Sequence, residues 1–253
     1  MTKETGLKVA ILITARLKSA RLPLKAIRPI KGRPLLCHMF DRLKLASIPE
    51  EIIVCTSSVA QDDILEEIAI TEDVACFRGH PDDVLARITA AAEHFKVDIV
   101  ISCTADNPFV DPNYIDRLVE FHINDENDFS RIDGLPFGTF SYALSFPAMV
   151  RACEIKDEVD TEVWGGYFTE TGLFKCGTLK VMEHKLKRPE IRLTVDEPED
   201  FELIQRIFDS LYEPNKFFSL EEIITLYDDN SELQKINNHI KQKRGISIKT
   251  KPL

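Results

Sequence analysis

Short apolar runs alternate with amphipathic segments through the first half of the chain, and this alternation constrains the fold more than any other feature. The apolar runs are rich in β-branched residues and lie at residues 8–15, 51–57, 74–77 and 98–104. Segments with apolar positions at helical spacing alternate with them, at residues 34–46, 59–70, 82–95 and 112–123. Buried strands that alternate with helices are typical of a mostly parallel sheet covered on both faces. We therefore predict an α/β fold.

The alternation stops in residues 124–190. This part of the chain carries turn signals such as Gly165-Gly166, and it has alternating polar and apolar stretches at residues 137–144 and 174–181. Such a pattern favours irregular structure with antiparallel strands. We expect a small antiparallel extension, either inserted into the parallel sheet or laid beside it.

The last part of the chain returns to strand and helix signals. Residues 192–195 form a short apolar run that predicts a strand, and residues 197–212 follow as a helix with a proline in its first turn. Two short helices are expected within residues 219–241. The chain has no low-complexity linker and no internal repeat. We therefore predict one domain over residues 1–253, with a loose basic tail at residues 242–253.

A basic segment at residues 16–33 stands out in a chain that is acidic overall. The segment holds seven basic residues and no acidic one, whereas the whole chain has a formal net charge of −10. An acidic balance argues against a broad nucleic-acid surface, because such a surface needs clustered positive charge. The local reversal of charge is therefore a candidate binding site for a small anion.

The position of this segment favours phosphate binding. It follows the first predicted strand, and ligands of parallel α/β sheets bind at the carboxyl ends of strands. Arg16 and Arg21 offer planar forks of donors, Lys25 offers a movable charge and Ser19 a hydroxyl. The segment lacks the Gly-rich Gly-Lys-Ser/Thr pattern of a P-loop. The alternative is a solvated basic loop, or a surface for an acidic partner.

Two aspartates follow predicted strands. Asp106 lies just beyond residues 98–104, and Asp196 lies just beyond residues 192–195. If both strands belong to one sheet, both carboxylates emerge at the edge that carries the basic segment. Such oxygen ligands suit Mg²⁺, which takes one or two carboxylates together with phosphates and waters. The alternatives are a turn or helix cap for Asp106 and an N-cap for Asp196.

The chain carries no sign of export or membrane insertion. The apolar stretch near its beginning is short and runs into basic residues, unlike a secretory signal. No window is long and apolar enough to span a bilayer, so we expect a cytoplasmic protein without membrane insertion. Six cysteines are scattered without Cys-x-x-Cys spacing, at positions 37, 55, 76, 103, 153 and 176. We expect buried free thiols rather than zinc ligands or disulfides.

Four groups of residues, in this order along the chain, resemble the motifs of one enzyme family. The first is Ala15-Arg16-x-x-Ser19-x-Arg21-Leu22-Pro23-x-Lys25, followed by Gly32-x-Pro34-Leu35. The second is Gly79-x-x-Asp82-Asp83-Val84-Leu85-x-Arg87. The third is Thr104-x-Asp106-x-Pro108 with Asp111-Pro112, and the fourth is Arg192-Leu193-Thr194-Val195-Asp196-x-Pro198-x-Asp200. Together they resemble the cytidylyltransferases that make CMP-activated sugar acids, in particular the branch named after spore coat polysaccharide protein F.

The resemblance implies a fold and an activity. The expected fold is a single-domain, mostly parallel, Rossmann-like nucleotidyltransferase sheet of the GT-A type. The expected reaction couples CTP to a sugar acid or a related acidic acceptor and gives a CMP-activated product and pyrophosphate, in cell-surface polysaccharide biosynthesis. A homodimer is also implied, formed through the region 124–190 and in particular through residues 137–181.

The resemblance also assigns roles to individual residues. Mg²⁺ would be held by Asp106 and Asp196, and the catalytic residues would be Arg16, Lys25 and Asp106. Arg192 would orient the acceptor, although a structural salt bridge explains it equally well. The nucleotide-binding residues would be Ala15, Arg16, Ser19, Arg21, Lys25, Arg78 and Asp82, with Arg87 as a weaker candidate.

Leu24 and Ala105 depart from the family pattern, which usually has glycine at both positions. Glycine permits a positive φ and a close approach of the backbone to phosphate. Leu24 therefore removes one backbone contact to phosphate or marks a branch with a different substrate. Both departures bear on the substrate and on the level of activity.

Several other polar and aromatic residues have simple structural explanations. Asp82 and Asp83, like Glu199 and Asp200, begin predicted helices, where the helix dipole favours a negative charge. His38 fits a packing or surface role on a helix. Trp164, together with Gly165-Gly166 and Tyr167, either lines an acceptor pocket or belongs to the core or to a subunit contact.

Two other functions remain compatible with this sequence. A nucleotide-sugar-dependent glycosyltransferase shares the α/β layout, but it usually carries an Asp-x-Asp metal motif at mid-chain. The segment TADNPFVD after residue 103 lacks that pair. A catalytically impaired nucleotide-binding paralogue is the second alternative, and Leu24 is the residue that favours it.

Overall fold

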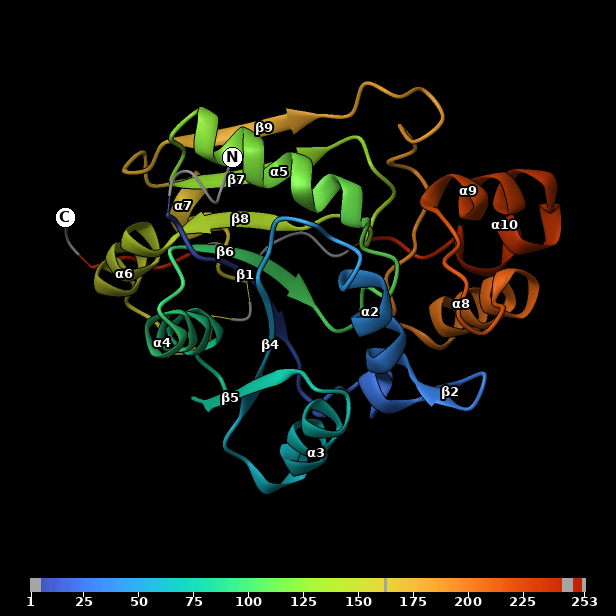
Figure 1. Ribbon diagram of the computed structural model, residues 1–253, viewed down its shortest axis with the longest axis horizontal. Helices are drawn as coiled ribbons and strands as arrows, with labels where there is room; N and C mark the ends of the chain where they lie inside the picture. Colours follow the sequence, from blue (N-terminus) through green and yellow to red (C-terminus); the bar gives the residue numbers. More distant parts are fainter. Residues whose placement is uncertain (1–5, 162, 243–247, 252–253) are drawn as a thin grey trace.

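A seven-stranded sheet with strand order β5-β4-β1-β6-β8-β7-β9 forms the centre of the computed structural model (Figure 1), which describes residues 6–161, 163–242 and 248–251. Every strand of this sheet except β8 runs in the same direction. The predicted mostly parallel α/β fold is therefore confirmed. The strands are β1 (Val9–Thr14), β4 (Glu51–Ser57), β5 (Ala75–Gly79), β6 (Ile99–Thr104), β7 (Phe129–Asp133), β8 (Tyr142–Ser145) and β9 (Cys176–Lys180).

Strand β1 shows why the sheet is covered on both faces. Val9, Ile11 and Ile13 face one apolar core, whereas Ala10 and Leu12 face the other, and all five are buried. The first core includes residues of α2 (Leu35–Leu43), α3 (Asp63–Thr71), α5 (Pro112–Asn124), α8 (Pro198–Leu211), α9 (Leu220–Asp229) and α10 (Ser231–Asn237). The second includes residues of α4 (Val84–Phe95), α6 (Phe146–Ile155) and α7 (Gly166–Thr169).

The region 124–190 continues the main sheet and also contributes α6 and α7. Strand β8 pairs antiparallel with both β6 and β7, so this part of the predicted antiparallel structure is inserted into the sheet. The expectation is wrong for residues 174–181, because their strand β9 pairs parallel with β7 at the edge of the sheet. The predicted strand at residues 137–144 is shorter than expected, because only Tyr142–Ser145 pairs as a strand. A separate antiparallel pair, β2 (Pro29–Ile30) and β3 (Arg33–Pro34), turns around Gly32 within the basic segment.

The predicted strand at residues 192–195 is wrong. This segment makes one isolated parallel bridge, between Phe137 and Arg192. Its backbone hydrogen bonds go to loops: Leu193 N donates to Phe137 O at 2.7 Å, and Val195 N donates to Asp106 O at 2.8 Å. The neighbouring chain is irregular, so no regular ladder forms although the segment is apolar and buried.

Part of the predicted loose tail is held in place. Asp157 N donates to Lys249 O at 3.0 Å, and Lys251 N donates to Ile155 O at 2.8 Å, so residues 248–251 pair with the end of α6. The prediction of a loose tail is therefore wrong for these residues. Residues 243–247 and 252–253 lie outside the described residues.

The state of the cysteines and the character of the helices can be compared with the predicted buried thiols and the predicted lack of membrane insertion. All six cysteines are free; Cys37, Cys55 and Cys103 are buried, whereas Cys176 is exposed. The expectation of buried thiols is therefore only partly met. Among the described residues, no helix combines the length and the apolar character that a bilayer crossing requires.

Candidate active site

The first and third motifs leave the sheet at the same edge. Strands β1 and β6 are paired in register up to Thr14 and Thr104. Beyond this point Ala105 N donates to Thr14 O at 3.0 Å, and Ala15 N donates to Cys55 O at 3.3 Å. The loops that follow β1 and β6 therefore start side by side. Ala15 was a predicted nucleotide-binding residue, but its backbone amide already donates a hydrogen bond to the neighbouring strand.

A buried carboxylate fixes the start of the basic loop. Leu17 N donates to Asp62 Oδ1 at 2.8 Å, and Ser57 Oγ donates to Asp62 Oδ2. The apolar side chains of Leu17 and Leu22 are buried in the first core, which leaves the charged side chains of the loop outside it. Ser19 Oγ accepts a hydrogen bond from Leu22 N at 3.3 Å, so this predicted phosphate ligand also stabilises the turn.

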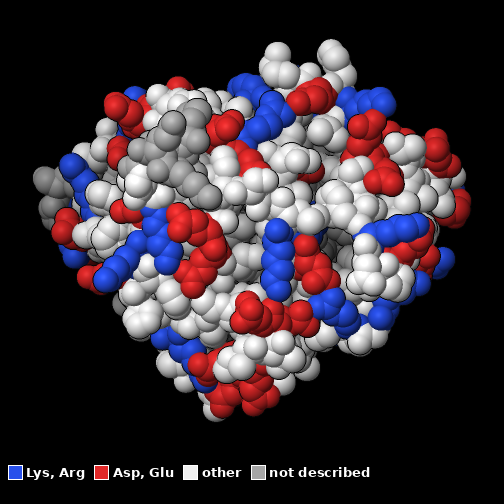
Figure 2. All heavy atoms as spheres, viewed as in Figure 1, with Lys and Arg blue, Asp and Glu red and all other residues white. Residues whose placement is uncertain are grey.

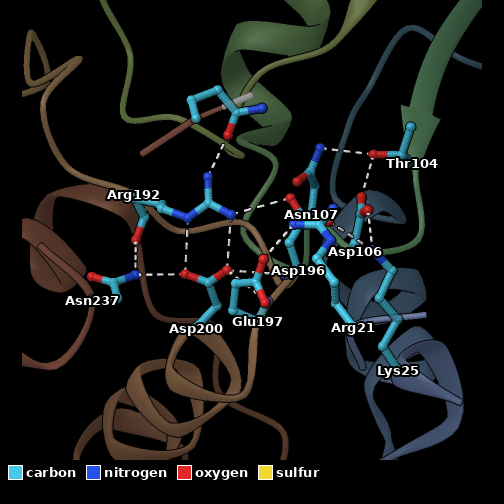
Figure 3. A network of polar contacts seen from close by, with 11 residues as sticks. Arg21, Lys25, Thr104, Asp106, Asn107, Arg192, Asp196, Glu197, Asp200 and Asn237 are labelled. Atoms are coloured by element: carbon cyan, nitrogen blue, oxygen red, sulfur yellow. Dashed lines mark hydrogen bonds and ion pairs between the residues drawn. The ribbon is translucent and has the colours of Figure 1, made fainter. Parts of the chain in front are cut away.

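Lys25 joins the two predicted metal ligands (Figure 3). Its Nζ lies 2.6 Å from Asp106 Oδ2 and 3.0 Å from Asp196 Oδ1. Burial opposes the charge of Lys25, but the two carboxylates outweigh it and raise its pKa. Burial likewise acts to raise the pKa of Asp196, but Lys25, Arg21 and Arg192 lower it. The structure thus brings together three residues that the sequence placed at one sheet edge, and the position of Lys25 between the two carboxylates was not predicted.

Short contacts hold Asp106 in this position. Thr104 Oγ1 donates to Asp106 Oδ1 at 2.5 Å, and Asn107 Nδ2 donates to Thr104 Oγ1 at 2.9 Å. The backbone bond from Val195 to Asp106 also ties the two aspartate segments together. Thr104 was quoted within a motif, whereas Asn107 was not identified from the sequence.

The second aspartate is held by a buried ion pair. Arg192 Nε and Nη2 each donate to the Asp200 carboxylate at 2.9 Å, and Nη2 also lies 3.1 Å from Asp196 Oδ2. Asp200 has no exposed surface, and it accepts hydrogen bonds from the amides of Asp196 and Glu197 at 3.0 Å. Asn237 Nδ2 adds a bond to Asp200 at 2.9 Å. Arg192 is therefore a structural ion-pair residue. Asp200 was expected only to place a negative charge at the start of a helix, but it also binds Arg192 and two backbone amides.

Arg21 extends the network toward solvent. Its Nη2 lies 3.3 Å from Asp196 Oδ1, and its Nη1 donates to Glu197 Oε1 at 2.7 Å (Figure 3). Hydrogen bonding to Glu197 is the main reason that the pKa of Arg21 is raised. Glu197 was not identified as a site residue, because it occupies an unspecified position of the fourth motif.

The second motif contributes one of its predicted residues to the neighbourhood of the basic loop. Arg16 Nη1 donates to Pro81 O and lies 3.3 Å from Asp82 Oδ1. Asp83 instead caps α4, where its Oδ1 accepts from Ala86 N at 3.0 Å. Arg87 is buried and donates to His80 O at 2.6 Å, which supports the same turn.

Arg78 is not brought into the network around Lys25. Its Nη2 lies 2.5 Å from Asp63, and its Nη1 lies 3.1 Å from Glu66, both on α3. It also donates to the backbone carbonyls of Ser57 and Val59. These contacts occupy the guanidinium and explain its position without a nucleotide.

Leu24 adopts the backbone conformation that glycine favours. Its φ is 59° and its ψ is 22°, in the left-handed region, and it stands at the start of the short 3₁₀ helix η1 (Lys25–Ile27). Glycine adopts this conformation without a steric penalty, whereas a leucine there costs about 1–2 kcal/mol of local strain. The side chain is 41% exposed, so little burial compensates for this strain.

A cavity of about 440 Å³ opens beside the carboxylates. Asp106, Asp196 and Asn107 line its inner end, and Arg131 on β7 is the cationic residue of its wall. Five aromatic residues also line it, namely Phe129, Phe137, Phe140, Tyr142 and Trp164. A concave, largely apolar site with few polar groups is typical of small-molecule binding.

The wall of this cavity contains residues that the sequence left open or did not indicate. Trp164 is 8% exposed; it belongs to the second core, as one alternative expected, and it also lines the cavity, whereas Tyr167 belongs to that core without lining the cavity. Gly138 has a φ of 93°, and a Cβ there would lie 2.5 Å from Thr194 N, so only glycine permits the close approach of these segments. Arg131 carried no sequence signal, because single basic residues are common in alternating strands.

The carboxylates of Asp106 and Asp196 suit a hard cation that binds together with phosphate. Within the described part of the chain, no three His, Cys, Asp or Glu residues converge on a metal position. Asp106 and Asp196 converge as a pair, and Mg²⁺ commonly takes one or two carboxylates and completes its shell with substrate phosphates and water. These two residues therefore fit Mg²⁺ together with a nucleotide.

The surface charge agrees with a local anion site. On the face shown in Figure 2, acidic and basic side chains are interspersed, and no broad basic area is seen. The positive charge of the basic segment is partly balanced by carboxylates: Lys31 pairs with Asp209 at 2.6 Å and Arg33 with Glu72 at 2.6 Å. The surface in this view therefore lacks the electrostatic footprint of a nucleic-acid-binding protein.

The fold and the site define a class of protein: an α/β protein with a basic loop and paired carboxylates at the carboxyl edge of its sheet, as nucleotide-binding enzymes have. A family model described as "Cytidylyltransferase" matches residues 10–228. The chain belongs to the cytidylyltransferase family. This membership supports a nucleotidyltransferase activity.

Three similar proteins illustrate the relationship. The chain is 29% identical to the spore coat polysaccharide biosynthesis protein SpsF of Bacillus subtilis, over 88% of this chain and 95% of that protein. It is 27% identical to the 8-amino-3,8-dideoxy-manno-octulosonate cytidylyltransferase of Shewanella amazonensis, over 64% of this chain and 65% of that protein. A solved cytidylyltransferase of Leptospira borgpetersenii superposes with a TM-score of 0.81 at 26% identity, covering 90% of this chain and 96% of that chain.

Proposed function

We propose that this protein transfers a cytidylyl group from CTP to an acidic sugar or a related acceptor, with release of pyrophosphate. The observation that carries the proposal is the contact of Lys25 with both Asp106 and Asp196, at a sheet edge beside a 440 Å³ cavity. The relatives add the choice of nucleotide and of acceptor class. We also propose that the reaction takes place in the cytoplasm and serves polysaccharide biosynthesis.

The reaction forms one bond and breaks one. An oxygen of the acceptor attacks the α-phosphorus in line, the bond from this phosphorus to the bridging oxygen of the β-phosphate breaks, and pyrophosphate leaves with the electron pair. The proton of the acceptor hydroxyl passes to solvent. The protein needs no nucleophile of its own, because positioning and charge neutralisation supply the rate enhancement.

The basic loop binds the triphosphate in this mechanism. Arg16, Arg21 and Lys25 hold the phosphates and offset the charge that develops on the leaving pyrophosphate. Asp106 and Asp196 would hold Mg²⁺, which would supply charge neutralisation at the phosphates. Lys25 Nζ contacts both carboxylates in the absence of nucleotide, and its flexible stem allows it to exchange one of them for a phosphate when the nucleotide binds.

The aromatic cavity receives the acceptor. Arg192 is committed to Asp200, so Arg131 is the better partner for an acceptor carboxylate. Arg131 Nε donates to Thr178 Oγ1 at 3.2 Å, which leaves the outer nitrogens of the guanidinium to face the cavity. The aromatic residues, including Tyr142 and Trp164, offer ring faces for the C–H groups of a sugar.

A pyrophosphate-release assay tests the proposal. The protein is incubated with Mg²⁺ and each nucleoside triphosphate in turn, with and without 8-amino-3,8-dideoxy-manno-octulosonate or its 8-hydroxy analogue. We expect acceptor-dependent release of pyrophosphate with CTP. We expect it to fall by about 10²-fold or more in Asp106→Asn, and to stay unchanged in Asp133→Asn, an exposed aspartate paired with Lys180.

The same assay separates the alternatives. CTP binding without pyrophosphate release for any acidic acceptor would favour a catalytically impaired paralogue. Release of a nucleoside diphosphate from a nucleotide sugar would favour a glycosyltransferase. Either result would overturn the proposed function.

A further inference from the structure

A second cavity, of about 500 Å³, lies between α2, the end of α8 and residues 212–218. Figure 1 shows α2 and α8 next to each other, on the side of the sheet that also carries α9 and α10. The cavity shares no lining residue with the one beside Asp106. Its volume is within the range of small-molecule sites.

Six residues with aromatic rings line this cavity, namely His38, Phe109, Phe208, Tyr212, Phe217 and Phe218. Phe208 is central, because its ring centroid lies 5.4 Å from those of Phe109 and Phe218, 5.9 Å from that of Tyr212 and 4.6 Å from that of His38. His38 is buried, and its Nε2 is hydrogen-bonded to a backbone carbonyl, as its predicted packing role requires. This wall suits a flat apolar group.

Arg42 enters the aromatic wall from α2. Its side chain is 5% exposed, its Nε donates to Val110 O at 3.0 Å, and its Nη1 donates to Phe218 O at 2.8 Å. Three rings surround its Cζ, at 4.7 Å for Phe217 and at 5.8 Å for both Phe109 and Phe218. The guanidinium is thus held firmly in a largely apolar surrounding.

The charge of Arg42 lacks a counterion in direct contact. The other cations that line the cavity are paired, Arg33 with Asp41 and Lys216 with Glu213, whereas no ion pair joins Arg42 to any described carboxylate. Its Nη2 is buried and has no hydrogen-bond partner among the described residues. Burial lowers the pKa of Arg42 to about 10, although Asp111 and Glu222 act against this shift from a distance. A buried, unpaired donor on a cation is costly unless a ligand satisfies it.

We propose that this cavity binds a small aromatic carboxylate. The carboxylate accepts a hydrogen bond from Nη2 of Arg42, and the ring packs against Phe208 and Tyr212. Phe217 is 44% exposed and covers the guanidinium from the solvent side, so its ring turns aside when the ligand enters. A neutral ring would leave the cation unpaired, and an aliphatic anion would leave the aromatic wall unfilled.

Three probes test this on the unmodified protein. Benzoate, benzyl alcohol and acetate are titrated while backbone amide chemical shifts are followed by NMR. We expect saturable shifts with benzoate, concentrated in residues 108–110 and 208–218, and binding of the other two that is weaker by about tenfold or more. Equal binding of benzoate and benzyl alcohol, absence of shifts in residues 208–218, or no saturation up to about 10 mM benzoate would overturn the proposal.

Two matched variants locate the anion. We expect Arg42→Met to lose the benzoate shifts in residues 208–218, and Arg131→Met, which alters the other cavity, to keep them. The single tryptophan, Trp164, lines only the other cavity, so its fluorescence should not follow these shifts. Retention of the benzoate shifts in Arg42→Met would overturn the proposal. The comparison of probes on the unmodified chain decides the question if Arg42→Met does not fold.

Discussion

Lys25 and its two carboxylates set the chemistry of the site at the scale of single residues. Two aspartates that converge repel each other, and the lysine between them neutralises part of that charge before any ligand arrives. The lowered pKa of Asp196 and the raised pKa of Lys25 both report this mutual stabilisation. The same lysine is free to exchange a carboxylate for a phosphate, because its charge sits on a flexible stem.

Replacing Lys25 should abolish most of the activity while keeping the fold. In Lys25→Met we expect the turnover of CTP to fall by about 10²–10³-fold, because a charge that stabilises the transition state is lost. Lys18→Met is the matched control, since Lys18 lies exposed in the same loop and carries the same charge. Pyrophosphate release measures both variants. Turnover in Lys25→Met within about tenfold of the unmodified protein would contradict the assigned role.

Leu24 should be a strained residue whose replacement by glycine stabilises the protein. Its φ of 59° lies in the left-handed region, where the Cβ of a leucine is sterically strained. Because glycine removes this strain, we expect Leu24→Gly to raise the free energy of unfolding by about 1 kcal/mol. Leu24→Ala removes the same exposed side chain but keeps the penalty, and should therefore show no such gain. Urea denaturation compares the three proteins. Equal stability of the glycine and alanine variants would show that this backbone is not strained.

The start of α8 shows how one element positions the site. Glu197 and Asp200 form a reciprocal capping box, and Pro198 occupies the first turn. Asp200 also binds Arg192 and the amide of Asp196, so the helix start and the segment that carries Asp196 are one hydrogen-bonded unit. The orientation of Asp196 thus depends on the packing of α8.

Ionisation of Asp200 should make the stability of this unit depend on pH. Burial opposes its charge, but Arg192, Asn237 and backbone amides outweigh burial and lower its pKa. The stabilisation is therefore complete above the ordinary aspartate pKa and is lost as the pH falls through the lower pKa of the folded state. We expect Asp200→Asn to cost about 3 kcal/mol near neutral pH, because it leaves a buried arginine unpaired.

Chemical denaturation at several pH values measures this effect. The difference between Asp200→Asn and the unmodified protein should be constant from pH 5 to 7 and should shrink below about pH 4. Glu202→Gln, which changes an exposed glutamate on the same helix, should show little difference at any pH. A difference for Asp200→Asn that stays constant down to about pH 2 would show that its ionisation does not contribute.

Sequence patterns predicted the elements whose burial shows directly in a local run of apolar residues. The alternation of these runs predicted the strands β1, β4, β5 and β6, and the motifs pointed to Lys25, Asp106 and Asp196, which the structure places in contact. The patterns failed where the structure of a segment depends on which partner it meets. Residues 192–195 look like a strand but pair with loops. Asp200 looks like an ordinary helix-start charge, and only its burial against Arg192 distinguishes it.

Association of two copies is the prediction at the scale of the whole molecule. We propose that the protein forms a homodimer through the region around residues 137–181. Two apolar side chains there are exposed, Val159 at 59% and Val163 at 44%. Val159→Asp should weaken the dimer, because the charge would be desolvated at the contact.

Sedimentation velocity measures this association. Ile70→Asp is the control, because Ile70 is 70% exposed on α3, outside the proposed region, and the variant should remain dimeric. An unmodified protein that is monomeric at about 100 µM would rule out a dimer of useful affinity. Equal dissociation of both variants would place the contact elsewhere.

The two sides of the site come from separate stretches of the chain. Residues 16–25 provide the basic loop, whereas residues 129–142 and 163–169 build most of the wall of the aromatic cavity. The aspartates stand where the two sides meet. Under the proposed function, separate segments would therefore recognise the nucleotide and the acceptor. Mutation of the wall segments would then change the accepted molecule and leave the basic loop unaltered, so exchanging these segments between relatives would be a rational route to new products from this scaffold.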